Sequence, residues 1–195
     1  MMRKFFVAAT VAAAAAASAN AQITFSNVTI GGSLAGTVSF ATGPTDIDFT
    51  STAIVGDAMA ARSGDIAIEY IAQADAGLFS DQIVLSLLGA LQGSGQITIL
   101  EQVFDLTQVG EPIIANFMTT ITDNADLPLD ETLVFSTTSE RVRVNKRILL
   151  DATTDTPAFD LASVALIEQN FGVMPEPASA ALLAIGVLLG MRRRA

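Results

Sequence analysis

From residue 22 onward, apolar and polar residues alternate in short runs that glycine, proline, asparagine and aspartate interrupt. In the clearest run, 65–72, Ile66, Ile68 and Tyr70 fall on one side of an extended chain and Glu69 falls on the other. This period is typical of a β-strand with one buried face. Similar runs predict strands in the following ranges: 23–30, 36–41, 47–49, 97–103, 113–122, 133–135 and 141–147.

Three stretches depart from simple alternation. In 23–30 the apolar positions change phase, which predicts a β-bulge near Ser26 and Asn27. Residues 81–91 form a continuous apolar run, which fits a buried strand or a short helix equally well. Residues 158–171 also fit either element, and we favour a strand that leads directly into the carboxy-terminal tail.

The many short strands, with turn residues between them and no internal repeat, predict an all-β fold. We expect a single β-sandwich domain over 22–172 with eight to ten strands. Jelly-roll topology is the preferred arrangement. An up-and-down barrel or an immunoglobulin-like sandwich remains open, because alternation does not reveal strand order.

The first 21 residues have the three parts of a secretory signal peptide. Arg3 and Lys4 form a basic start, residues 5–17 form an apolar segment, and Ala19 and Ala21 flank Asn20 as a small-x-small cleavage site. We therefore expect a signal helix over 1–21, export of the chain, and cleavage between Ala21 and Gln22.

The last segment, 173–195, has a second apolar run. Residues 178–191 carry no charge and would make about 21 Å of helix, which is short for a permanent membrane span. Arg192, Arg193 and Arg194 follow this run and should stay on the cytoplasmic side, so the body would lie outside. The pattern indicates a transient membrane helix rather than a lasting anchor.

Pro175, Glu176 and Pro177 stand directly before this apolar run. The ordered motif, apolar run and basic end resemble the sorting tail of PEP-CTERM proteins, which are bacterial exports. The resemblance implies two partners, the secretion machinery that exports the chain and an exosortase-type transpeptidase that reads the three residues of the motif. It further implies an inner-membrane-anchored intermediate that is released to the cell surface or extracellular matrix.

Between these ends the chain is strongly acidic, since residues 22–174 contain five basic and 19 acidic side chains. This balance disfavours nucleic acid as a partner.

The chain has no cysteine, histidine or tryptophan, which excludes Ser-His-Asp and Cys-His catalysis and zinc sites built on these residues. A carboxylate-only glycosidase would need an acid pair and usually an aromatic-lined cleft, so we expect no catalytic residues and no enzyme.

Two charged segments of the body are candidate sites. The loop 123–131 carries Asp123, Asp126, Asp130 and Glu131, which are calcium candidates although their spacing differs from the EF-hand pattern. A solvated acidic loop without metal or other cofactor is the preferred interpretation. In 141–147, alternation places three arginines opposite two valines, which predicts a basic stripe for an anionic polysaccharide or, preferentially, a protected strand edge.

The sequence therefore predicts a non-enzymatic exported protein with a structural or interaction role at the cell surface or in the extracellular matrix. The alternative is a calcium-dependent carbohydrate-binding module of the exopolysaccharide matrix. Saturable glycan binding would distinguish the second function from the first.

Overall fold

The computed structural model describes residues 22–57, 59–85, 90–153 and 159–174. Ala19 and Ala21 of the cleavage site, the motif at 175–177 and the arginines at 192–194 lie outside these ranges, as do both predicted terminal helices. In the part of the chain that is described, no helix is long and apolar enough to cross a membrane.

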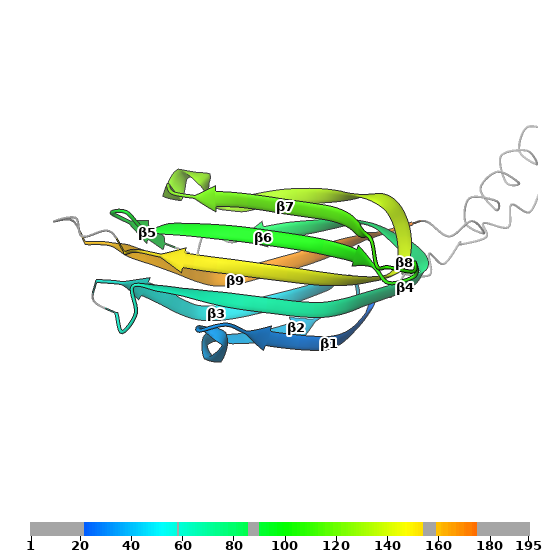
Figure 1. Ribbon diagram of the computed structural model, residues 1–195, viewed down its shortest axis with the longest axis horizontal. Coiled ribbons are helices and arrows are strands. Elements are labelled where there is room, and N and C mark those ends of the chain that lie inside the picture. The colour runs from blue at the N-terminus through cyan, green and yellow to red at the C-terminus, as the bar shows by residue number, and fades with distance from the viewer. Residues whose placement is uncertain (1–21, 58, 86–89, 154–158, 175–195) are drawn as a thin grey trace, which may run out of the picture. The chain divides into compact units, whose positions relative to one another are not determined.

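The described residues form nine strands and two short 3₁₀ helices (Figure 1). In chain order they are β1 (Thr24–Gly31), η1 (Ala35–Thr37), β2 (Val38–Thr42), β3 (Asp46–Gly56), β4 (Ser63–Leu85), β5 (Ala90–Gln92), β6 (Gln96–Asp105), β7 (Ile113–Ile121), η2 (Asn124–Asp126), β8 (Leu129–Asp151) and β9 (Leu161–Val173). Every strand pairing is antiparallel. The body is therefore an all-β, antiparallel sandwich, as the alternation predicts.

The sandwich has two layers. The front sheet has the order β1, β4, β8, β6, β7 and uses the first half of β4 and the second half of β8. The back sheet has the order β2, β3, β9, β4, β8 and uses the other halves of the two long strands, with β5 paired to β9. The 23-residue strands β4 and β8 thus pass together from one layer to the other.

The strands change layer where the β4–β8 register breaks, between Gln73 and Leu78. Gly77 has a φ of +86° at this corner, and a Cβ there would lie 2.7 Å from Thr138 Cγ2. Only glycine accepts this backbone and this approach without strain. The corner explains why alternation alone predicts separate strands where the chain has one continuous, bent strand.

The core lies between the two layers. Inward side chains of the front sheet, such as Ile68 and Tyr70, pack against Phe49 and Ile167 of the back sheet, and all are almost fully buried. The Tyr70 and Phe49 ring centroids are 5.9 Å apart. Burial of such side chains contributes about 1.5–3 kcal/mol each, which gives a cysteine-free body its main source of stability.

Several local predictions are confirmed. The β1–β4 register shifts between Ser26 and Thr29, and Asn27 has a φ of 53°, so the predicted bulge is present. Residues 81–85 belong to β4 rather than to a helix, and β9 is the strand favoured for the last segment. The prediction that 141–147 protects a sheet edge is wrong, because β8 lies between β4 and β6.

Candidate functional site

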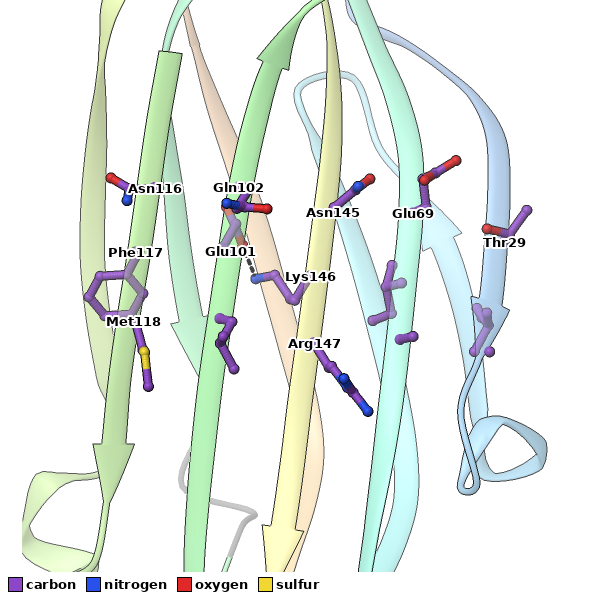
Figure 2. A pocket seen from close by; sticks show the side chains of 15 residues that line it. Thr29, Glu69, Glu101, Gln102, Asn116, Phe117, Met118, Asn145, Lys146 and Arg147 are labelled. Carbon is purple, nitrogen blue, oxygen red and sulfur yellow. Dashed lines mark ion pairs between the residues drawn. The ribbon is translucent and has the colours of Figure 1, made fainter. Parts of the chain in front are cut away.

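The outer face of the front sheet contains a hollow of about 700 Å³. Figure 2 shows the 15 residues that line it, and they are three consecutive residues from each of the five front strands. Ligand sites in proteins commonly have volumes of about 300–1,000 Å³. The hollow is therefore large enough for a small molecule or a segment of a polymer.

Five polar side chains form a continuous row across this hollow, which we call the polar row. Its members face one another from strand to strand in the order Thr29, Glu69, Asn145, Gln102 and Asn116. Figure 2 shows the row crossing the five strands of the front sheet. Neighbouring strands lie about 4.8 Å apart, so four gaps give the row a length of about 19 Å.

The polar row offers both donors and acceptors of hydrogen bonds. Each amide supplies an NH₂ group and a carbonyl oxygen, the Thr29 hydroxyl does both, and the Glu69 carboxylate accepts. With its amide nitrogen turned toward β4, Asn145 donates to Glu69 Oε2 over 3.0 Å. This contact fixes the centre of the row and leaves the exposed amides of Gln102 and Asn116 open to a ligand.

The next outward row along the strands is different in character. Gly31 and Ala67 leave space on β1 and β4, while Leu100 and Met118 present apolar surface on β6 and β7. Met118 is 68 % exposed. A polar row beside small and apolar residues is the combination expected where a ligand with hydroxyl groups and C–H faces binds.

Arg147 completes this second row and is held in place by Asp65. Its Nε and Nη2 donate to Asp65 Oδ2 over 3.3 and 3.1 Å. Asp65 also accepts from the backbone N–H and the hydroxyl of Ser33. The Ser33 backbone hydrogen bond is the main cause that lowers the pKa of Asp65, and the Ser33 hydroxyl and Arg147 add to it against the effect of burial.

The predicted basic stripe lies on the outer face of β8, but acidic partners neutralise much of it. Arg147 pairs with Asp65, and Arg143 pairs with Glu111 over 2.8 Å. The Arg143 guanidinium also lies 4.9 Å from the centre of the Phe104 ring. These contacts argue against a surface dedicated to an anionic polysaccharide.

The four calcium candidates do not come together. Asp123 caps η2 by accepting from the Ala125 N–H over 2.9 Å, and Asp130 accepts from Gln82 over 2.7 Å. Glu131 is exposed on β8. Across 22–57, 59–85, 90–153 and 159–174, no three acidic side chains are grouped closely enough to hold a metal ion.

Directly behind the hollow, a cluster of ionisable side chains is buried between the two sheets. Lys146 Nζ lies 2.6 Å from Glu101 Oε2, and both side chains are 0 % exposed. Gln169 of the back sheet donates to Asp81 over 3.2 Å and to Glu101 over 3.4 Å, and accepts from the Tyr70 hydroxyl over 2.5 Å. The alternation of 141–147 places Lys146 on the same side as Val142 and Val144, and this is the signal in the sequence that points to its inward position.

Burial raises the pKa of Asp81 well above its ordinary value. The negative charge of Glu101 and a hydrogen bond with it raise this pKa further, while Lys146 and Gln169 act in the opposite direction. Desolvation, together with the two carboxylates, likewise raises the pKa of Tyr70. Asp81 therefore resists ionisation more strongly than an exposed aspartate does, because its negative charge would be buried beside Glu101.

The comparisons with known proteins identify no relative by sequence: no protein-family model matches the chain, and no curated protein sequence does. One solved structure similar to it is that of TmCBM61 in complex with β-1,4-galactotriose. It has 10 % sequence identity and a TM-score of 0.39, and the match covers 76 % of this chain and 86 % of that one. A likeness of this size does not indicate a function.

Proposed function

We propose that the body of this protein is a glycan-binding domain and that the front-sheet hollow is its binding site. The observation that carries the proposal is the polar row, which places five hydrogen-bonding side chains in register along about 19 Å of a hollowed sheet. A sugar chain presents hydroxyl groups at regular intervals, so an extended row of amides matches it better than a single polar pocket would.

The charges around the hollow favour a neutral glycan. Glu69 accepts hydrogen bonds from hydroxyl groups but repels carboxylated or sulfated sugars. Arg147 is paired with Asp65 at the rim, so its charge is largely compensated. The half-buried side chain of Leu100 and the exposed side chain of Met118 fit the C–H faces of a sugar ring in a chain that has no tryptophan.

The affinity test uses the double variant Gln102→Ala/Asn116→Ala. Both side chains are exposed, so the variant should fold normally while it loses two amides of the polar row. Each lost hydrogen bond to a ligand is worth about 0.5–1.5 kcal/mol, which predicts a loss of affinity of roughly 5- to 150-fold. A neutral glycan array identifies the ligand, and calorimetry then measures both proteins, in calcium and in chelator.

The matched control is Gln73→Ala, because Gln73 is an exposed amide on the same face of β4 but outside the hollow. It should bind as the unchanged protein does. Equal affinity in all three proteins, or the absence of saturable binding to any neutral glycan, would refute the proposal.

We also propose that the protein is non-enzymatic, that it is exported, and that it acts at the cell surface or in the extracellular matrix after sorting by an exosortase-type system. The signal peptide at 1–21 and the tail at 173–195 support this proposal from sequence alone. Jelly-roll topology remains our prediction for the finer class of the sandwich. Glycan binding by the body would retain such a protein among exopolysaccharides.

Replacing Pro175, Glu176 and Pro177 together with alanine tests the sorting proposal. The unchanged protein should begin at Gln22 and lack its apolar tail when it is recovered from the matrix. The variant should keep the tail and stay in the membrane fraction, because the sorting enzyme no longer reads the motif. Terminal peptide mass spectrometry reports both ends, and release of the variant without its tail would contradict the proposal.

A further inference from the structure

The buried cluster behind the hollow places an amine against a carboxyl group in a dry environment. Lys146 and Glu101 face each other directly on the paired strands β8 and β6, and both point inward. The 2.6 Å contact between Nζ and Oε2 leaves the amine beside the Glu101 carboxyl carbon. Intramolecular reactions between two well-oriented groups have effective concentrations of about 10⁵ M or more. The contact between Lys146 and Glu101 holds the two groups in such a position.

A third group supplies the proton that such a reaction needs. Asp81 is fully buried beside Glu101, and burial raises the pKa of its carboxyl group, which favours the protonated form that can donate a proton. Gln169 donates to both carboxyl groups and fixes their orientation across the two sheets. The cluster therefore contains a nucleophile, an acceptor and a general acid in contact.

We propose that Lys146 and Glu101 join in a spontaneous intramolecular amide bond, with Asp81 as the acid that assists the reaction. The proposal concerns a covalent modification of the body and does not depend on glycan binding. It rests on the full burial of the three groups, on the contact between Lys146 and Glu101, and on Gln169, which donates to Asp81 and to Glu101 and so holds the two carboxyl groups side by side.

The reaction is a condensation that needs no oxidant or cofactor. One proton first passes from Lys146 to Glu101 across their contact and leaves a neutral amine and a neutral acid, a change that a dry interior favours relative to water. The Nζ lone pair attacks the Glu101 Cδ atom, and a C–N bond forms. Asp81 gives its proton to the departing hydroxyl group, the C–O bond breaks, and Asp81 recovers a proton from the amide nitrogen. One water molecule leaves.

The bond would fix the pair of strands that carries the centre of the polar row. Gln102 follows Glu101 in the chain and Asn145 precedes Lys146, so the inward bond and the outward amides share the same two strands. The chain has no cysteine, so it has no disulfide to hold these strands together outside the cell. An amide bond would provide a cross-link that reducing agents do not break.

Mass spectrometry of the full chain, purified and denatured under reducing conditions, tests the proposal. We expect a mass lower by one water molecule than the mass calculated from the sequence between the chain ends that the same measurement identifies. Trypsin should fail to cut after Lys146, and fragmentation should map the link to Glu101. An unmodified mass with normal cleavage after Lys146 overturns the proposal, and a link to Asp81 overturns the choice of Glu101 as the acceptor.

Two conservative variants separate the chemistry from folding. Lys146→Arg keeps the positive charge, but a guanidinium does not deprotonate in proteins, so no water should be lost. Asp81→Asn keeps the shape of the general acid and should slow bond formation by about 100-fold or more. Circular dichroism verifies that each variant is folded. Loss of water from Lys146→Arg would place the modification elsewhere and contradict the assignment.

Discussion

Replacing Lys146 with methionine is expected to lower the free energy of unfolding by about 3–5 kcal/mol. Methionine fills a similar volume but leaves the Glu101 carboxyl group without its cationic or covalent partner in a site that is 0 % exposed. A buried charge that loses its partner is among the most destabilising changes in a protein. Chemical denaturation of the two proteins at neutral pH gives the difference.

Two further variants show whether the buried charge is the cause. Adding Glu101→Gln to Lys146→Met should recover about 2 kcal/mol or more, because glutamine keeps the shape and removes the charge. The matched control is Arg147→Met, the exposed neighbour on the same strand, which should cost less than about 1 kcal/mol. Equal losses in Lys146→Met and Arg147→Met would contradict the burial of Lys146.

The second large effect is expected from Asp105→Ala, with a loss of about 2–4 kcal/mol. Asp105 is fully buried at the end of β6 and accepts from Thr107, Gln108 and Ser139. The 2.5 Å bond from the Ser139 hydroxyl ties this turn to β8 near the corner between the sheets. Alanine removes the acceptor of Thr107 and Gln108 and leaves the Ser139 hydroxyl with only the Arg141 carbonyl oxygen. Urea denaturation measures the loss.

The contribution of Asp105 should depend on pH in a defined direction. Burial raises the pKa of Asp105, but the hydrogen bonds from Ser139, Thr107 and Gln108 outweigh it and hold the pKa below its ordinary value. A carboxyl group whose pKa is lowered by folding stabilises the fold at pH values above its ordinary pKa. This stabilisation is lost as the pH falls through the lowered pKa of the folded protein.

The difference in stability between the unchanged protein and Asp105→Asn should therefore be largest at neutral pH and shrink in acid. Glu140→Gln, which changes an exposed carboxylate next to Ser139 in the chain, serves as the control and should change the stability little. A difference for Asp105→Asn that stays constant down to acid pH would show that its charge has no part in anchoring the turn.

Much of the fold could be predicted because one face of most strands is buried. Alternation at 65–72 placed Ile66, Ile68 and Tyr70 inward, and the phase shift in β1 revealed its bulge. The continuity of β4 and β8 could not be predicted, since a strand that changes layer reverses which positions are buried. In β4 this reversal occurs at Gly77, and it interrupts the alternation of apolar and polar residues from which strands are predicted.

The binding site could not be predicted in the same way. Thr29, Glu69, Gln102, Asn116 and Asn145 are spread over more than a hundred residues and have no motif in common. Only the strand register brings them into one row. The acidic loop at 123–131 attracted attention because its charges are adjacent in sequence, yet its carboxylates have separate local roles. Proximity in sequence and proximity in the sheet are different properties.

The most direct test of glycan binding at the front-sheet hollow is a nuclear magnetic resonance titration of the ¹⁵N-labelled protein with a neutral oligosaccharide selected on the array. The side-chain NH₂ signals of Gln102, Asn116 and Asn145 should shift with one common saturation curve, while the signal of Gln73 should stay unchanged. Shifts that are absent from these three amides, or that cluster on the back sheet instead, would contradict the proposed site.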